Sequence, residues 1–266
     1  MPAPTEIAPA QLVRLVGTPA MPAIVDARTA EDFDDDPRLV PGAVRHDWRD
    51  AAGLLARSGA GGRAVVYCQR GRKPSHGLAA RLRAGGVAAE VMEGGQFAWR
   101  DAGAPMVDAA ALPALVDGAT LWVTRHRPKV DRIAYPWLVR RFADPAARFL
   151  FVPPADVMPV AERFGAVPFD AGGAALADAP GRCTFDAMLD HLGLDHAPLA
   201  RMAHVIRAAD GAGGDAPEAA GLLAVLLGLS RMHRDDLAQL EAGMGVMDAL
   251  YRWARDATAE THGHGA

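Results

Sequence analysis

Cys68 lies where residues with reactive or charged side chains are most concentrated. Three cations, Arg70, Arg72 and Lys73, follow it within five residues, and Gly71 stands among them. The N–H groups of a loop around the sulfur, and the positive end of a following helix, stabilise a thiolate relative to a thiol. The same groups attract an anionic substrate. The segment therefore predicts a nucleophilic thiolate, and the alternative is a buried structural cysteine beside solvated charges.

The residues around Cys68 alternate between strand and helix patterns. We expect strands at residues 23–27, 42–46, 64–67 and 88–92, and a helix at residues 75–84. The wholly apolar run at 64–67 is of the kind that a parallel sheet buries on both faces. Cys68 would then follow the carboxyl end of a buried strand, where open parallel sheets bind their ligands. This part of the chain is predicted to be an α/β domain, a parallel sheet flanked by helices.

Residues 24–105 resemble the rhodanese (thiosulfate sulfurtransferase) domain. The resemblance is carried by IVDAR at 24–28, PGA at 41–43, VYCQRGRKPS at 66–75 and EGGQFAW at 93–99. It implies an active-site loop from Cys68 to Lys73, in which Cys68 carries a persulfide during the transfer of sulfane sulfur. The implied substrate-binding residues are Gln69, Arg70, Gly71, Arg72 and Lys73. The last loop position is usually Arg in this family and is Lys73 here.

The same resemblance separates two chemistries. Phosphatase relatives have a seven-residue loop that ends in Arg, whereas the seventh residue here is Pro74, which disfavours phosphate chemistry. Asp26 and Arg28 would be structural residues or would border the site. His76 is expected to be a helix-surface histidine rather than a local base. Sulfur transfer of this kind implies no cofactor, and its partners are a thiosulfate-like anionic donor and a thiol acceptor.

A second concentration of cations begins at Arg125. Residues 125–148 contain seven Arg or Lys against two acids. Arginine forks match tetrahedral oxyanions well, so Arg125, Arg127, Lys129 and Arg132 form a candidate oxyanion site. The alternative is a solvated cationic helix paired with acids of the helical tail.

The remaining periodicity predicts a second domain with a small sheet and many helices. We expect strands at 120–124 and 148–152 and helices at 130–142, 185–192, 198–209, 218–232 and 235–253. Residues 102–118 are rich in Ala, Pro, Gly and Asp without a period, which indicates a boundary there. The expected division is a domain at 1–110, a linker at 111–119 and a mostly helical α+β domain at 120–266.

The second part resembles the C-terminal domain of the chromate-resistance protein B family from residue 121 onward. The segment WVTRHRPKVDRIAYPWLVRRF at 122–142 carries most of the resemblance, supported by CTFD at 183–186 and DALYRW at 248–253. It implies a role in bacterial chromate resistance, as sensing and regulation or as direct detoxification. Chromate is therefore the oxyanion that the four cations would bind.

A metal ion is the other candidate ligand for the second domain. Its ligands would come from oxygen, nitrogen and sulfur side chains without a strong ligand spacing, namely Glu162, Asp170, Cys183, His204, Asp210, Glu260 and His262. Family members often carry a His pair shortly before the Cys, and this chain has ADAP at 177–180 instead. Surface roles are favoured for His191, His196, His233 and His264.

The composition of the chain limits the classes of function that it can have. The net charge of −4 does not favour binding to nucleic acid, and the longest apolar run, at 220–229, is too short to cross a membrane. The two cysteines are too few for a disulfide framework, and no secretory signal is evident, so a cytoplasmic enzyme is expected. The favoured function is a rhodanese-type sulfurtransferase fused to an oxyanion- or metal-binding chromate-resistance domain. The alternatives are a chromate-responsive transcriptional regulator and a metal-dependent redox protein.

Overall fold

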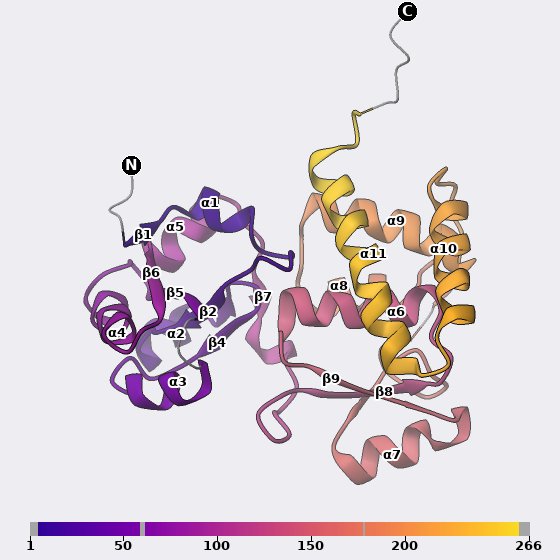
Figure 1. Cartoon of the computed structure of the whole chain (residues 1–266), viewed down its shortest axis with the longest axis horizontal. Coiled ribbons are helices and arrows are strands. Elements are labelled where there is room, and N and C mark those ends of the chain that lie inside the picture. Colours follow the sequence, from indigo (N-terminus) through magenta and orange to yellow (C-terminus); the bar gives the residue numbers. More distant parts are fainter. Residues whose placement is uncertain (1–4, 59–61, 178, 261–266) are drawn as a thin grey trace, which may run out of the picture. The chain divides into compact units, whose positions relative to one another are not determined.

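A computed structural model of the chain describes residues 5–58, 62–177 and 179–260 (Figure 1). The chain divides into two compact units. The first takes the chain up to Pro113, together with the short segments Val139–Pro145 and Leu192–Leu194. The second takes Ala114–Leu138, Ala146–His191 and the chain from Asp195. The division at Pro113 falls inside residues 111–119, whose role as a linker stays a prediction.

The first unit is built on a five-stranded sheet in the order β1-β6-β5-β2-β4, in which every neighbouring pair is parallel. Its elements are β1 (Glu6–Ile7), α1 (Pro9–Val13), β2 (Ala23–Asp26), α2 (Ala30–Asp35), β3 (Arg38–Leu39), β4 (Ala43–Arg45), α3 (Ala51–Ser58), β5 (Arg63–Tyr67), α4 (Lys73–Ala84), β6 (Ala88–Met92), α5 (Gly95–Asp101) and β7 (Val107–Asp108). β3 and β7 pair separately as a short antiparallel ribbon. The predicted α/β class is confirmed.

β5 lies in the middle of this sheet because its side chains are apolar on both faces. Residues 64–67 are all buried, as the sequence predicted. On one face Val66 packs in a cluster with Leu78 and Leu82 of α4 and with Leu54 of α3. Burying apolar side chains on both faces fixes the strand, and so fixes the position of the residue that follows it.

The second unit has a smaller sheet of three parallel strands in the order β10-β8-β9. β8 (Leu121–Arg125) is central, between β9 (Arg148–Val152) and β10 (Val167–Pro168). Successive side chains of β8 point to opposite faces of the sheet, as in any strand. Val123 packs with α7, whereas Trp122 meets Tyr135 edge to face, with ring centroids 5.5 Å apart.

Helices make up most of this unit, as predicted. They are α6 (Val130–Leu138), α7 (Val157–Phe164), α8 (Thr184–Leu192), α9 (Ala197–Asp210), α10 (Ala219–Met232) and α11 (Asp236–Asp256). The helix expected at 130–142 ends earlier as an α-helix, and Val139–Ala143 forms a π-helical turn. This change comes soon after Pro136, which has no N–H to donate within the helix. In the described part of the chain, no helix is long and apolar enough to span a membrane.

Candidate active site around Cys68

Cys68 directly follows β5, so it lies at the carboxyl end of the central strand of the first sheet. The residue is buried, with 3 % of its surface exposed. A short loop leads from it to α4, whose first residue is Lys73. The helix therefore begins two residues earlier than the sequence predicted, because Pro74 suits the first turn, where an N–H would have no partner inside the helix. The dipole of this twelve-residue helix begins at the loop that surrounds the sulfur.

Two hydrogen-bonding groups lie against the sulfur. The backbone N–H of Arg72 donates to Cys68 Sγ at 3.2 Å, and Ser75 Oγ lies 3.3 Å from the same atom. Ser75 Oγ is also 3.0 Å from the Arg72 carbonyl oxygen. A hydroxyl has one hydrogen, so it donates either to that carbonyl or to the sulfur. When Cys68 is a thiol, it can donate a hydrogen bond to Ser75 Oγ while Ser75 donates to the carbonyl. When Cys68 is a thiolate, it can accept a hydrogen bond from the Ser75 hydroxyl.

Two glycines allow the start of α5 to lie directly against the Cys68 loop. Gly71 has φ +61°, and a Cβ there would lie 2.7 Å from the Met92 carbonyl oxygen. Gly95 has φ +63°, and a Cβ there would lie 2.2 Å from the Cys68 carbonyl oxygen. Side chains at these positions would be strained in conformation and would also collide with backbone. The close contact lets Gln96 N–H donate to the Cys68 carbonyl at 2.9 Å.

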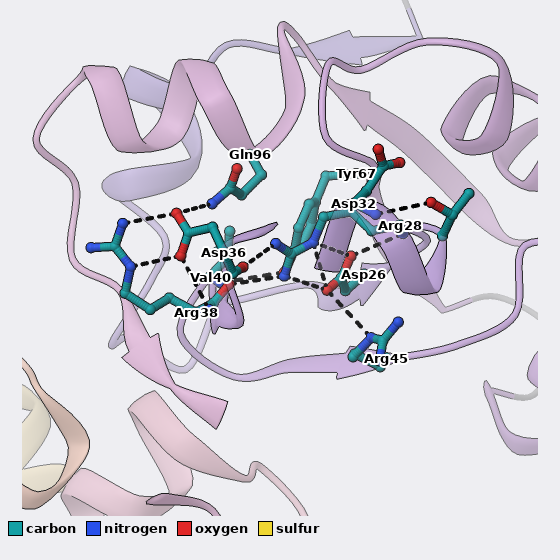
Figure 2. A network of polar contacts seen from close by, with 10 residues as sticks. Asp26, Arg28, Asp32, Asp36, Arg38, Val40, Arg45, Tyr67 and Gln96 are labelled. Carbon is teal, nitrogen blue, oxygen red and sulfur yellow. Dashed lines mark hydrogen bonds and ion pairs between the residues drawn. The ribbon is translucent and has the colours of Figure 1, made fainter. Parts of the chain in front are cut away.

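Gln96 connects the loop to a buried polar network (Figure 2). Its Nε2 donates to Asp36 Oδ2 at 2.8 Å, and Arg38 Nε donates to Asp36 Oδ1 at 2.8 Å. The hydrogen bond from Arg38, supported by the one from Gln96, lowers the pKa of Asp36 to about 2. Arg28 Nη1 donates to the backbone carbonyl oxygen of Asp36 at 2.7 Å. The loop that holds Cys68 is thus fixed through α5 to the segment after α2.

Asp26 and Arg28 form the centre of this network, as Figure 2 shows. Their side chains are fully buried, and Arg28 Nη2 lies 2.7 Å from Asp26 Oδ2. Arg28 also donates to the carbonyl of Arg38, and its guanidinium lies over the Tyr67 ring at 5.8 Å. Their hydrogen bonds and ion pairs are to each other, to Arg45 and to backbone groups rather than to the Cys68 sulfur. The structural or site-bordering role that the rhodanese resemblance implies for these two residues stays a prediction.

The other predicted loop residues surround the site without bonding the sulfur through their side chains. Arg70, Arg72 and Lys73 are exposed, and the Arg70 guanidinium lies over the Phe97 ring at 5.0 Å. Gln69 is half-buried, with its amide 3.5 Å from Asp35 Oδ2. Arg72 donates a hydrogen bond to the sulfur through its backbone N–H rather than through its guanidinium group.

Sequence reasoning missed Ser75 as a site residue. The sequence pattern identifies it only as the start of a helix, whereas the structure places it fully buried beside Cys68. A serine three residues after the N-cap of a helix that follows a cysteine loop is the signal that could have identified it. The functions of Gln96 and Asp36 depend on contacts between distant parts of the chain and had no such local signal.

Two of the four predicted oxyanion-binding cations of the second unit pair with a carboxylate. Arg125 Nη2 lies 2.9 Å from Asp170 Oδ1, and Arg132 Nε lies 3.0 Å from Asp170 Oδ2. Arg127 and Lys129 are exposed, and Arg127 Nη2 donates to the Ser230 carbonyl at 3.3 Å. Asp170 therefore neutralises part of the charge of two of the four predicted oxyanion residues.

The candidate metal ligands are dispersed. Within residues 5–58, 62–177 and 179–260, no group of three or more His, Cys, Asp or Glu side chains is arranged to hold a metal ion. Cys183 Sγ donates to Asp186 Oδ2 at 3.4 Å, and burial raises the pKa of this thiol. His204 Nε2 contacts the Asp215 carbonyl oxygen, and Glu162 and Glu260 are exposed. His262 and His264 lie outside the described residues.

Comparisons with known proteins follow the same division of the chain. Residues 122–254, half of the chain, match the family model described as ChrB, C-terminal domain. Protein ChrB of Cupriavidus metallidurans is 39% identical over 132 residues, which are 49% of this chain. The chain spans 39% of the length of that curated relative.

Solved structures with rhodanese-like folds are similar to the first part. The thiosulfate sulfurtransferase of Pseudomonas aeruginosa is 25% identical over 40% of this chain and 20% of its own, with a TM-score of 0.34. A rhodanese-related protein of Thermoplasma volcanium is 18% identical over 38% of this chain and 96% of its own, with a TM-score of 0.33. From Trp122 to Ala254, the match to the family model confirms the second resemblance drawn from the sequence, and the chain belongs to the ChrB C-terminal domain family.

Proposed function

We propose that this chain is a sulfurtransferase in which Cys68 carries the transferred sulfur as a persulfide. The observation that carries the proposal is the pair of hydrogen-bonding groups on one sulfur atom, the Arg72 N–H at 3.2 Å and the Ser75 hydroxyl at 3.3 Å. A buried cysteine with a purely structural role needs no such donors. Hydrogen bonds to a developing thiolate favour the charged nucleophile.

In the first step, the Cys68 thiolate attacks the outer sulfur of a thiosulfate-like donor. A bond forms between Sγ and that sulfur while the sulfur–sulfur bond of the donor breaks. Sulfite leaves with the electron pair of the broken bond, and Cys68 is left as an anionic persulfide. The exposed cations Arg70, Arg72 and Lys73 at the loop attract the anionic donor.

In the second step, an acceptor thiolate attacks the outer sulfur of the persulfide. The new sulfur–sulfur bond forms on the acceptor, and the bond to Sγ breaks with its electrons returning to Cys68 as a thiolate. The two donors on Sγ then stabilise the leaving group. Because Cys68 is buried, bulk water has little access to the intermediate between the two steps.

Replacement of the sulfur by oxygen tests the proposal. The Cys68→Ser variant of the full chain is expected to lose thiosulfate-to-cyanide sulfur transfer. The matched control is Cys183→Ser, because Cys183 is also buried but lies in the other unit, where its thiol hydrogen-bonds to Asp186. Equal turnover by wild type and Cys68→Ser would rule the proposal out.

For the second unit, the proposed ligand is an oxyanion such as chromate. The clustered guanidinium groups of Arg125 and Arg132 support this, and in the described structure Asp170 occupies them. An oxyanion that binds there must compete with this carboxylate, so Asp170→Asn is expected to increase chromate affinity in calorimetry. Equal affinity in wild type, Asp170→Asn and Arg132→Gln would exclude these residues as the chromate site.

A further inference from the structure

A cleft of about 470 Å³ opens in the first unit between the loop after β2 and the loop after β4. Arg28 and Thr29 line it on one side, and Arg45, Trp48 and Arg49 line it on the other. Both loops leave the carboxyl ends of their strands, which is the edge of the sheet where Cys68 lies. The cleft is therefore part of the ligand-binding edge of this parallel sheet.

The cleft carries excess positive charge. Arg28 is neutralised by the buried Asp26, but Arg45 lies 3.9 Å from the same carboxylate, with 39% of its side chain exposed. The Arg49 side chain is 68% exposed and lies 3.6 Å from Asp47. Asp47 is the one carboxylate among the described residues that line the cleft.

Aromatic rings hold the two exposed guanidinium groups in place. The Arg45 guanidinium lies 3.7 Å from the centroid of the Phe33 ring, and that of Arg49 lies 4.2 Å from the Trp48 ring. Stacking on a ring restricts a flexible side chain while its N–H groups remain available. Two positioned guanidinium groups are suited to bind carboxylates, each through paired N–H donors.

The cleft lies within reach of Cys68 because of the strand order. β2 pairs with β5 in the register Asp26↔Tyr67, and Ala27 N–H donates to the Tyr67 carbonyl at 2.7 Å. On the other side, β2 pairs with β4 up to Arg45. Adjacent strands are about 4.8 Å apart, so the end of β4 is about 10 Å from the end of β5. Only one strand, β2, separates the strand that ends at the cleft from the strand that leads to Cys68.

We propose that this cleft is the acceptor subsite, and that the acceptor is a small thiol bearing carboxylates, held by Arg45 and Arg49. The inference rests on the proposed sulfurtransferase function. A cleft of this volume falls in the range of about 300–1,000 Å³ that binds organic ligands, and it is much larger than a thiosulfate ion needs. With its carboxylates on the two guanidinium groups, the thiol end of the acceptor reaches toward the Cys68 persulfide and attacks its outer sulfur.

Matched thiols of different charge test the subsite. The full chain is loaded with thiosulfate, and the rate of persulfide discharge is measured with mercaptosuccinate, 2-mercaptoethanol and cysteamine. In Arg45→Gln and Arg49→Gln, the value of kcat/KM for the dianionic mercaptosuccinate is expected to fall about tenfold, equivalent to about 1.4 kcal/mol. The value for the neutral thiol is expected to stay within about twofold, because it makes no use of the guanidinium groups.

Arg63→Gln is the control variant. Arg63 is an exposed, ion-paired arginine of the same unit at the amino end of β5, and its loss should change none of the three rates. If both cleft variants leave the rate with mercaptosuccinate unchanged, or lower all three rates equally, the subsite is wrong.

A separate binding measurement keeps the two proposals distinguishable. If no persulfide forms in wild type, the proposed function fails. Calorimetry with mercaptosuccinate then still decides the subsite, which requires weaker binding in both cleft variants than in wild type and Arg63→Gln. Equal heats in all four proteins would overturn it.

Discussion

Ser75→Ala is the perturbation that most directly probes how the sulfur is held. The variant removes the hydroxyl 3.3 Å from Cys68 Sγ and leaves the Arg72 N–H in place at 3.2 Å. Hydrogen bonds to charged groups contribute about 1.5–3 kcal/mol, and the long contact to sulfur places this one at the lower end. A loss of about 1.4 kcal/mol corresponds to about tenfold in rate.

The expected result is therefore a fall of about tenfold in kcat/KM for thiosulfate. The rate of Cys68 alkylation by iodoacetamide should fall by a similar factor, because both reactions use the same thiolate. Stability should change less, since the second hydrogen bond lost, to the Arg72 carbonyl, contributes about 1 kcal/mol.

Thr18→Val is the matched control for Ser75→Ala. Thr18 Oγ1 donates to the Leu15 carbonyl three residues earlier, the same local bond that Ser75 makes to Arg72. Its loss should affect the melting temperature without changing either rate. If folded Ser75→Ala reacts within about twofold of wild type in both assays, the hydroxyl does not stabilise the thiolate and our reading of the site is refuted.

Three further predictions concern the framework of the first unit. Gly95→Ala should lower thermal stability and abolish turnover, because residue 95 has φ +63° and its Cβ would lie 2.2 Å from the Cys68 carbonyl oxygen. Gly77→Ala is the control, and it should preserve both stability and turnover because there is open space around Gly77. Arg28→Ala should destabilise the unit by about 3–5 kcal/mol in chemical denaturation, since Asp26 stays buried without its closest partner, and an unchanged midpoint would contradict this. The pKa of Asp36, about 2, is below its usual value of about 4, so its contribution to stability is present above pH ~4 and is lost as the pH falls toward 2. Asp36→Asn should flatten that part of the stability–pH curve, and an identical curve for wild type and variant would exclude the role.

The sequence predicts the α/β class of the first unit because the signals of its central strands and of α4 are local. The apolar run before Cys68 predicts a buried parallel strand, and Gly85 and Gly86 end the helix that follows. The polar network was harder to predict. Gln96 and Asp36 meet across sixty residues of chain, and no periodicity encodes such a contact. The short helix α2 also escaped prediction, because its sequence AEDFDD lacks an apolar stripe.

The second unit shows where counting charges misleads. From the sequence, Arg125 and Arg132 belong either to an oxyanion site or to a cationic helix paired with acids of the helical tail, because the nearby acids are few. In the structure Asp170, 45 residues after Arg125, is brought to both of them by β10 and the segment after it. Asp170 was singled out as a weak metal candidate, but its described partners are guanidinium groups. Charge pairing of this kind depends on sheet topology, which the local pattern does not contain.

Intact-protein mass spectrometry after incubation with thiosulfate tests the central claim most directly. Wild type and Cys183→Ser should each gain the mass of one sulfur atom, removable by a thiol, while Cys68→Ser should gain none. An unchanged wild-type mass, or the same gain in Cys68→Ser, would contradict the assignment of Cys68 as the sulfur carrier.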